Sequence, residues 1–246
     1  MWAIVPIKQF DFAKSRLAPA LDPAERRGLV RAMAEDVLDC LAATPGIERI
    51  VVVTREPEVE TLARTRGADI LLETADGELL AAVAQGAAAA AAAGARGVVI
   101  VPGDLPLATP AALLTVLESH RRLQAERPGA PAVTLVPDAR HEGTNCLACS
   151  PPEVIPFRFG RGSCAAHLAA ARDRGIDAQL IEVPDLALDV DSPEDLPALL
   201  ARTEAGRSVA FLHASGIASR VARAHEEQPA TVLANMADRG HLGGKA

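Results

Sequence analysis

The stretch "GVVIVPGDLPLATPAALLTVLESH", residues 97–120, decides the fold because a strand, a loop and a helix follow one another within it. Its first part, "GVVIV" (97–101), is almost wholly apolar, which is typical of a strand buried on both faces of a sheet. Thr109 is the expected cap of the helix that follows. A buried strand, a short polar loop and a capped helix form the unit from which helix-covered parallel sheets are built.

The same unit recurs before this stretch. The sequence predicts strands over residues 2–7, 49–54 and 68–73 and helices over residues 22–44, 56–67 and 76–94. Asp22 and Pro23 give the first of these helices a cap and a favourable first residue. The connections are short, so the pattern predicts a mostly parallel sheet with helices on both faces.

The second half of the chain continues with strands and helices. Strands are predicted over residues 130–137, 145–150, 178–183 and 186–190, and helices over 163–174, 192–203 and 208–224. We expect a single domain over residues 1–205, followed by a C-terminal helix and a frayed tail over residues 206–246. The fold class is therefore α/β, and ligands are expected at the carboxyl ends of the strands.

Composition excludes several classes of protein. The chain has 246 residues, of which 49% are hydrophobic and 23% charged, with a net charge of −7. The negative charge argues against a nucleic-acid surface. No apolar run reaches the roughly 18 residues of a membrane span, and the first residues lack the features of a signal peptide. We expect a cytoplasmic protein that does not bind membranes, and the sequence leaves a homodimer open.

Acidic residues follow two of the predicted strands. Asp104 comes after the strand at 97–101, and Asp189 and Asp191 flank Val190 at the end of another. Residues two apart in an extended segment point the same way, so three carboxylates can converge on one point. Carboxylate oxygens suit Mg²⁺, with water and phosphate completing its coordination. The simpler alternatives are that Asp104 caps its own turn and that Asp191 only begins a helix.

The first loop carries three cations. Lys8, Lys14 and Arg16 follow the strand at residues 2–7. In isolation they fit a solvated face as well as a ligand site. Their position after a strand end favours the ligand site.

A second candidate lies in "FRFGRGSCAAHLAAAR", residues 157–172. Gly160 and Gly162 allow the backbone to approach a ligand closely, and Ser163 can cap the helix and donate its hydroxyl. Unpaired N–H groups at a helix start favour anions, here a phosphate or carboxylate. A plain capped helix is the alternative, and the neighbouring arginines favour the anion.

Cysteines offer a zinc alternative. The spacing of Cys146, Cys149, Cys164 and His167 resembles a zinc site with three cysteines and one histidine. Residues three apart on a strand face opposite ways, however, so small buried cysteines are the favoured interpretation. His167 lies one turn into its helix and is as suitable for a structural hydrogen bond as for a ligand contact.

Five motifs together resemble one family. They are "PIKQFDFAKSRLAP", "PGDLPL", "GTNCL", "PFRFGRGSCAAHLAAA" and "LDVDSPEDL". They occur in the family's order over residues 1–200 and resemble the CofC/FbiD guanylyltransferases. The resemblance implies a three-layer α/β/α sandwich of the nucleotide-diphospho-sugar transferase (GT-A-like) fold. It also implies Mg²⁺ as cofactor and transfer of GMP from GTP to 2-phospho-L-lactate, phosphoenolpyruvate or 3-phospho-D-glycerate, with release of pyrophosphate, in coenzyme F-420 biosynthesis.

The resemblance also implies roles for single residues. It places Lys8, Lys14 and Arg16 at the triphosphate, Asp104, Asp189 and Asp191 at the metal, and Thr144, Gly160 and Ser163 at the phosphorylated acid. Asp104, Lys14 and Arg16 are thus the expected catalytic residues. One position departs from the family, because Leu80 stands where an asparagine near the nucleotide is usual. Two other classes stay open: a related enzyme acting on a molybdopterin or sugar acceptor, and a non-catalytic nucleotide-binding protein.

Overall fold

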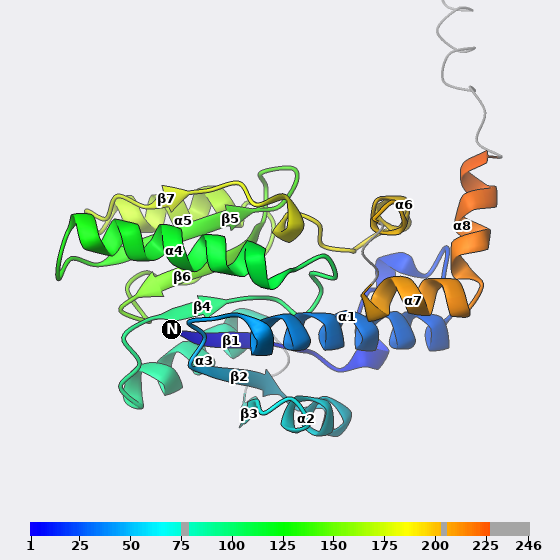
Figure 1. Cartoon of the computed structure of the whole chain (residues 1–246), viewed down its shortest axis with the longest axis horizontal. Coiled ribbons are helices and arrows are strands. Elements are labelled where there is room, and N and C mark those ends of the chain that lie inside the picture. The colour runs from blue at the N-terminus through cyan, green and yellow to red at the C-terminus, as the bar shows by residue number, and fades with distance from the viewer. Residues whose placement is uncertain (75–78, 203–205, 227–246) are drawn as a thin grey trace, which may run out of the picture.

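The protein is built around one seven-stranded sheet, shown in a computed structural model that describes residues 1–74, 79–202 and 206–226 (Figure 1). The strand order is β3-β2-β1-β4-β6-β5-β7. Only β6 runs antiparallel to its neighbours among these seven described strands. The strands are β1 Trp2–Pro6, β2 Arg49–Thr54, β3 Asp69–Leu72, β4 Val98–Ile100, β5 Ala132–Pro137, β6 Thr144–Ser150 and β7 Gln179–Leu180.

Helices cover both faces of this sheet and complete a three-layer α/β/α sandwich. The helices are α1 Pro23–Ala43, α2 Pro57–Arg64, α3 Leu79–Ala92, α4 Pro110–Glu126, α5 Ser163–Arg172 and α6 Leu196–Leu200. Along β1, Ala3 and Val5 face a core shared with α1, α2 and α4, whereas Ile4 faces a second core shared with α3 and α5. The alternation of faces along one apolar strand is what a sheet buried on both sides requires.

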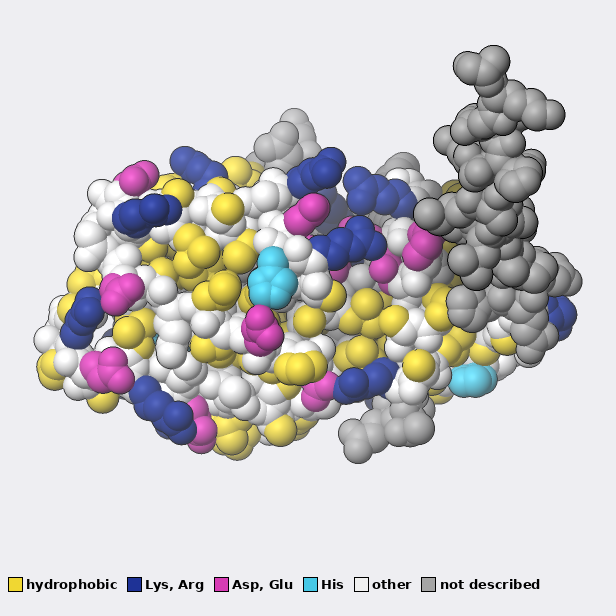
Figure 2. Space-filling view, turned by 90° about the horizontal axis from the view of Figure 1, so that it is seen from above, with side chains coloured by type: hydrophobic (Ala, Val, Ile, Leu, Met, Phe, Trp, Pro, Cys, Tyr) yellow, Lys and Arg dark blue, Asp and Glu magenta, His cyan; other side chains and the backbone are white. Residues whose placement is uncertain are grey.

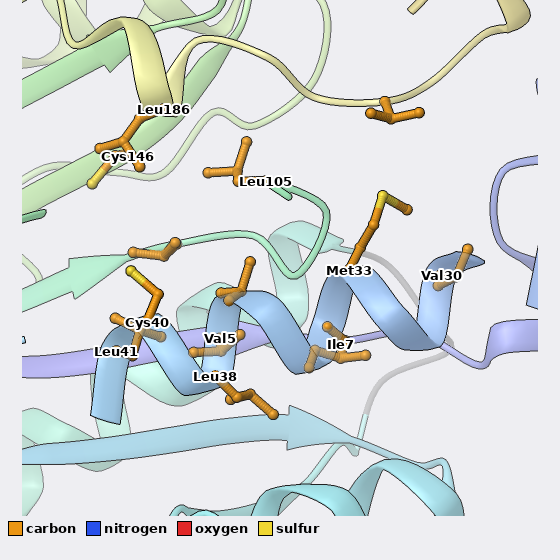
Figure 3. Close-up of a cluster of buried hydrophobic side chains, with 14 of the residues drawn as sticks. Val5, Ile7, Val30, Met33, Leu38, Cys40, Leu41, Leu105, Cys146 and Leu186 are labelled. Carbon is orange, nitrogen blue, oxygen red and sulfur yellow. The ribbon is translucent and has the colours of Figure 1, made fainter. Parts of the chain in front are cut away.

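The start of α1 shows how local sequence fixes an element. The Asp22 side chain accepts a hydrogen bond from the Glu25 backbone N–H at 2.8 Å, and the Glu25 side chain accepts one from the Asp22 backbone N–H at 3.0 Å. This capping box, with Pro23 as first helical residue, confirms the predicted helix start. Further along α1, Met33 and Leu38 point into the core that Figure 3 displays.

The prediction of a strand over residues 186–190 is wrong. The chain forms a short 3-10 turn, Pro184–Leu186, and then irregular structure. The segment is held instead by the Asn145 side-chain amide, which donates to the Leu186 carbonyl at 3.0 Å, and by Val190, which is fully buried.

The single helix predicted over residues 208–224 is two helices, α7 Arg207–Ala214 and α8 Ile217–Glu226. Gly216 separates them with a φ of 74°, a left-handed conformation that glycine adopts easily. The Asp36 carboxylate on α1 accepts hydrogen bonds from the first two backbone N–H groups of α7 at 2.7 and 2.9 Å, which fixes this helix against the sandwich. The predicted frayed tail beyond residue 226 lies outside the described residues.

The described surface carries charges of both signs. Figure 2 shows Lys and Arg side chains interleaved with Asp and Glu side chains, and some of them surround a hollow. Within the described ranges, none of the helices combines the length and the apolar composition that crossing a bilayer requires.

Candidate active site

Two acidic loops meet the first loop at the carboxyl end of the sheet. The Lys14 ammonium donates to Asp104 Oδ2 at 2.5 Å and also to Asp191 Oδ1. Asp104 follows β4, Lys14 follows β1, and these two strands are parallel neighbours. The fold therefore brings together residues that are 90 and 177 positions apart. We call Lys14, Asp104, Asp189 and Asp191 the carboxylate–lysine cluster.

Apolar anchors fix the loops that carry these charges. Ile7 and Leu105 precede and follow the charged positions, and both side chains are buried in the core under the sheet edge (Figure 3). Leu17 closes the first loop and is fully buried. Lys14 itself has a φ of 55°, which is uncommon for a residue other than glycine. The surrounding packing thus holds the Lys14 backbone where its side chain reaches both carboxylates.

Asp195 fixes the segment that carries Asp191. Its Oδ2 atom accepts hydrogen bonds from the backbone N–H groups of Asp191 at 2.9 Å and of Ser192 at 2.7 Å. The Ser192 hydroxyl donates to the same oxygen at 3.0 Å. The predicted helix start at Ser192 is confirmed, and its capping box orients the neighbouring Asp191.

The cluster carries more negative than positive charge. Burial, together with the nearby carboxylates of Asp104 and Asp191, raises the pKa of Asp189 to about 6. Burial alone would lower the pKa of Lys14, but the two carboxylates that it contacts outweigh burial and raise it. Three carboxylates around one ammonium thus repel one another and attract a further cation.

The donor set fits a hard divalent cation, because oxygen ligands from carboxylates are what such ions prefer. In the described parts of the chain, no three acidic, histidine or cysteine side chains are arranged as a metal-binding group. The Lys14 ammonium instead stands between Asp104 and Asp191, where it neutralises them as a metal would. The metal site predicted from the sequence therefore stays a prediction, and in this structure the Lys14 ammonium lies between two of its three acids.

Lys8 and Arg16 lie on the same loop as Lys14 but are exposed. Within the described residues, neither forms an ion pair or a side-chain hydrogen bond. The structure thus brings Lys14 to the acidic residues and leaves the other two cations at the surface beside them.

A second cluster lies at the same edge of the sheet. Because β6 is antiparallel to β4 and Leu147 pairs with Ile100, Thr144 at the start of β6 lies at the edge where β4 ends. Thr144 Oγ1 is 3.0 Å from His167 Nδ1 and accepts a hydrogen bond from the Ser163 hydroxyl at 3.3 Å. We call Thr144, Ser163 and His167 the hydroxyl–histidine cluster, and all three are buried.

Hydrogen bonding assigns the tautomer of His167. The Arg158 backbone N–H donates to His167 Nε2 at 2.9 Å, so Nε2 is an acceptor and Nδ1 carries the proton. Nδ1 then donates to Thr144 Oγ1, which leaves the Thr144 hydroxyl proton available to a ligand. Burial and the charge of Arg158 lower the pKa of His167 to about 4 and keep the ring neutral. The sequence placed His167 one turn into the helix but did not reveal that it joins β6 to the glycine-rich turn.

The expectation that Ser163 caps α5 is wrong. The cap residue is Gly162, with a φ of 75°, and Ser163 is the first helical residue. Its hydroxyl turns inward to Thr144, so it makes no capping hydrogen bond. Gly160 has a φ of 116°, and both glycines adopt backbone conformations that other residues rarely reach. The two glycines therefore shape the backbone of this turn, their approach to a ligand stays a prediction, and the Ser163 side chain lies inside the cluster.

The cysteines that are close together in the sequence do not share one site in the structure. Cys146 and Cys149 both lie on β6, and they belong to the two cores on opposite faces of the sheet. The four cysteines of the chain are buried and free. Burial raises the pKa of Cys146 to about 12, which disfavours the thiolate that binds metals.

The α/β sandwich of this chain has a close counterpart among solved structures. A solved structure from Desulfovibrio desulfuricans G20, described as a nucleotide-diphospho-sugar transferase, superimposes with a TM-score of 0.69 at 14% identity. The match covers 89% of this chain and 96% of that one. At this identity the likeness establishes the fold, which is that of the nucleotide-diphospho-sugar transferases.

Sequence relatives narrow the class further. A phosphoenolpyruvate guanylyltransferase of Conexibacter woesei is 38% identical over 90% of this chain and 96% of its own length. A 2-phospho-L-lactate guanylyltransferase of Methanothermobacter thermautotrophicus is 32% identical over 85% of this chain and 88% of its own. The family model "Guanylyl transferase CofC like" matches residues 1–232. The chain belongs to this guanylyltransferase family, and it is a nucleotidyltransferase.

Leu80 stands at the position where the resemblance leads us to expect an asparagine. It lies in the first turn of α3, half-exposed. An aliphatic side chain cannot hydrogen-bond to a base or ribose, so any such contact on this chain comes from another residue.

Proposed function

We propose that this protein transfers GMP from GTP to a small phosphorylated acid in the cytoplasm, as a step of coenzyme F-420 biosynthesis. The observation that carries the proposal is the meeting of Lys14 with Asp104 and Asp191 at the carboxyl edge of the sheet, in a chain of the guanylyltransferase family. A triphosphate is a polyanion, and this edge offers it both an ammonium and acids suited to a divalent cation.

The reaction needs no general base from the protein. An oxygen of the acceptor's phosphate forms a bond to the α-phosphorus of GTP, and the bond from this phosphorus to the β-bridging oxygen breaks. Pyrophosphate leaves with that electron pair. Because the attacking oxygen is already anionic at neutral pH, the protein contributes positioning and charge neutralisation.

The carboxylate–lysine cluster serves the nucleotide side of this reaction. Asp104, Asp189 and Asp191 would hold Mg²⁺, which neutralises phosphate charge and polarises the phosphorus–oxygen bonds when bound. Lys14 balances the acids and faces the β- and γ-phosphates, and Arg16 and Lys8 add positive charge from the same loop. The exposure of Arg16 and Lys8 leaves both side chains able to move toward a triphosphate.

The hydroxyl–histidine cluster serves the acceptor. Thr144 directs its hydroxyl proton to the phosphorylated acid, because its oxygen already accepts from His167 and Ser163. Gly160 allows the backbone N–H groups before α5 to approach the anion. Ser163 acts mainly through Thr144, since its own hydroxyl is buried and directed there.

The test is a pyrophosphate-release assay with a matrix of substrates. GTP, ATP, CTP and UTP are each combined with phosphoenolpyruvate, 2-phospho-L-lactate, 3-phospho-D-glycerate and glucose 1-phosphate, with Mg²⁺ present. We expect turnover with GTP and at least one of the three acids, with phosphoenolpyruvate first because the more similar of the two relatives carries that name. Turnover with glucose 1-phosphate alone, or with no acceptor under any nucleotide, would overturn the proposal.

A further inference from the structure

Glu73 is a buried carboxylate at the nucleotide end of the sheet that the mechanism does not use. Glu73 is 7% exposed as a whole residue, and its Oε1 atom has no hydrogen-bond partner, alone among buried side-chain atoms in the part of the chain that the structure describes. Buried acceptors without a donor are rare in folded proteins and call for an explanation. A ligand that supplies the missing donor is one such explanation.

The backbone around Glu73 is held on both sides. Its N–H donates to the Thr54 carbonyl at 3.0 Å and so extends the β2–β3 pairing by one residue. The Arg55 Nε donates to the Glu73 carbonyl at 2.9 Å. The carboxylate is therefore attached to a fixed strand end and not to a freely moving loop.

Glu73 lies at the same carboxyl edge of the sheet as the loops that carry the carboxylate–lysine cluster. The order β3-β2-β1 places the end of β3 two strands from the end of β1, where the loop with Lys14 begins. Neighbouring strands are about 4.8 Å apart, so two strands span roughly 10 Å. A nucleotide bound along this edge can therefore place its base near the end of β3 while its phosphates lie toward the loops after β1 and β4.

The chemistry of a lone carboxylate selects one base. Guanine presents two adjacent donors on its pairing edge, N1–H and the 2-amino group. Adenine presents an acceptor beside a donor there, cytosine presents two acceptors beside its amino group, and uracil presents one donor between two acceptors. A carboxylate only accepts, and its two oxygens can take both guanine donors side by side.

We propose that Glu73 is the residue that selects guanine, by accepting hydrogen bonds from its N1–H and 2-amino groups. This deepens the proposed function and depends on it, because it names the base-reading group of the same site. Glu73, just after β3, would thus make the hydrogen bond to the base that the aliphatic side chain of Leu80 cannot make. Glu73 is a specificity-determining residue here, and the reacting phosphorus lies elsewhere.

The experiment compares binding of GTP with binding of inosine triphosphate, which lacks only the 2-amino group. Titration calorimetry with Mg²⁺ and without acceptor measures both dissociation constants, so no turnover is needed. The wild-type protein should bind GTP about tenfold more tightly than inosine triphosphate. In Glu73→Gln, one acceptor oxygen becomes a donor, so GTP binding should weaken about tenfold and the ratio of the two constants should approach one.

Asp69→Asn is the matched control. Asp69 begins the same strand and pairs with Arg49 at its opposite end, so this variant should keep the wild-type ratio. Thermal melting of both variants checks that they fold, and Glu73→Ala supplies a second variant that must also lose the preference. An unchanged ratio in folded Glu73→Gln overturns the assignment. If GTP and inosine triphosphate weaken equally while 2′-deoxy-GTP binds as it does to the wild type, Glu73 contacts the ribose and the assignment is also overturned. Wild-type protein that binds no nucleotide would contradict the guanylyltransferase proposal itself.

Discussion

The two polar clusters at the carboxyl edge differ in how completely their groups are satisfied. In the hydroxyl–histidine cluster, each group is neutral and buried, and His167 uses both ring nitrogens. In the carboxylate–lysine cluster, three acids share one ammonium, and burial together with the neighbouring acids raises the pKa of Asp189. One cluster is neutral and leaves the Thr144 hydroxyl proton for a ligand, and the other carries unbalanced charge.

This difference indicates how each cluster meets its substrate. A satisfied network holds donors in fixed directions and loses little on binding, which suits a small acid that must be oriented. An excess of negative charge binds cations strongly, which suits a site where metal and triphosphate arrive together. The comparison can be tested by removing one group at a time.

The largest effect is expected from Asp104→Asn. Replacing an acid of the carboxylate–lysine cluster removes a ligand for a hard cation, so turnover should fall by about 10³-fold or more. Circular dichroism should remain that of the wild type, because the Asp104 side chain is partly exposed. Asp69→Asn is the control. Pyrophosphate release near the wild-type rate would remove Asp104 from the metal site.

The two clusters should respond to acid in opposite directions. His167 has a folded pKa of about 4 against 6.5 ordinarily, so unfolded protein binds the extra proton and stability falls as the pH drops from 6.5 toward 4. Asp189 has a folded pKa of about 6 against 3.8 ordinarily, so it adds stability as the pH drops through 6. Each slope is at most about 1.4 kcal/mol per pH unit, and smaller for Asp189 because solvent screens it.

Urea unfolding of metal-free protein at several pH values measures both slopes. His167→Gln should reduce the loss of stability on acidification, and Asp189→Asn should increase it. His120 is a matched control away from the site, since burial also lowers its pKa to about 4 and His120→Gln should act like His167→Gln. Slopes that change in the same direction for His167→Gln and Asp189→Asn would contradict the contrast between the clusters.

Lys14→Met should make the stability of the protein depend on Mg²⁺, because the variant lacks the ammonium that neutralises Asp104 and Asp191. Without Lys14, Asp104 and Asp191 repel each other, and the metal-free protein should lose about 1–2 kcal/mol, less than for a fully buried pair because both acids are partly exposed. Saturating Mg²⁺ should then raise the melting temperature more in Lys14→Met than in the wild type. Lys8→Met on the same loop is the control, and equal Mg²⁺ responses in all three proteins would refute this role.

The smallest expected effect is on the KM values, and it distinguishes the binding of the acceptor from the binding of GTP. Ser163→Ala removes a hydrogen bond to Thr144, so KM for the acceptor should rise about tenfold, equivalent to about 1.4 kcal/mol, while KM for GTP stays nearly constant. Arg16→Ala should show the reverse pattern because Arg16 faces the triphosphate in the proposed site. If Ser163→Ala weakens GTP and spares the acceptor, the assignment of the two clusters is reversed.

Local signals in the sequence were sufficient for most helices and strands. Asp22, Pro23 and Glu25 lie within one turn, and the helix start that they predict is confirmed. Residues 186–190 have an apolar pattern that favours a strand, yet their conformation depends on Asn145, which is 41 positions away from Leu186. No local pattern contains that contact.

The sequence predicts which residues form the candidate site better than it predicts how they are arranged. The acids and cations stand in recognisable loops, but that Lys14 lies between Asp104 and Asp191 depends on tertiary structure. The same is true of Ser163, whose sequence position suits a cap while Thr144 draws its hydroxyl inward. Both outcomes depend on contacts across the sheet edge that strand order creates.

The close contact between α1 and α7 has a consequence for synthesis on the ribosome. A methyl group on Gly28 would lie 2.4 Å from the ring of Phe211, and Asp36 binds backbone groups 171 and 172 positions later. When the nascent chain has emerged only as far as β7, the side of α1 that packs against α7 is therefore exposed to solvent. Asp36 then lacks the hydrogen bonds that it forms with the start of α7. Translation must continue past residue 212 before that side of α1 is covered, so the interval between these two points is the period in which a chaperone has an apolar surface to bind.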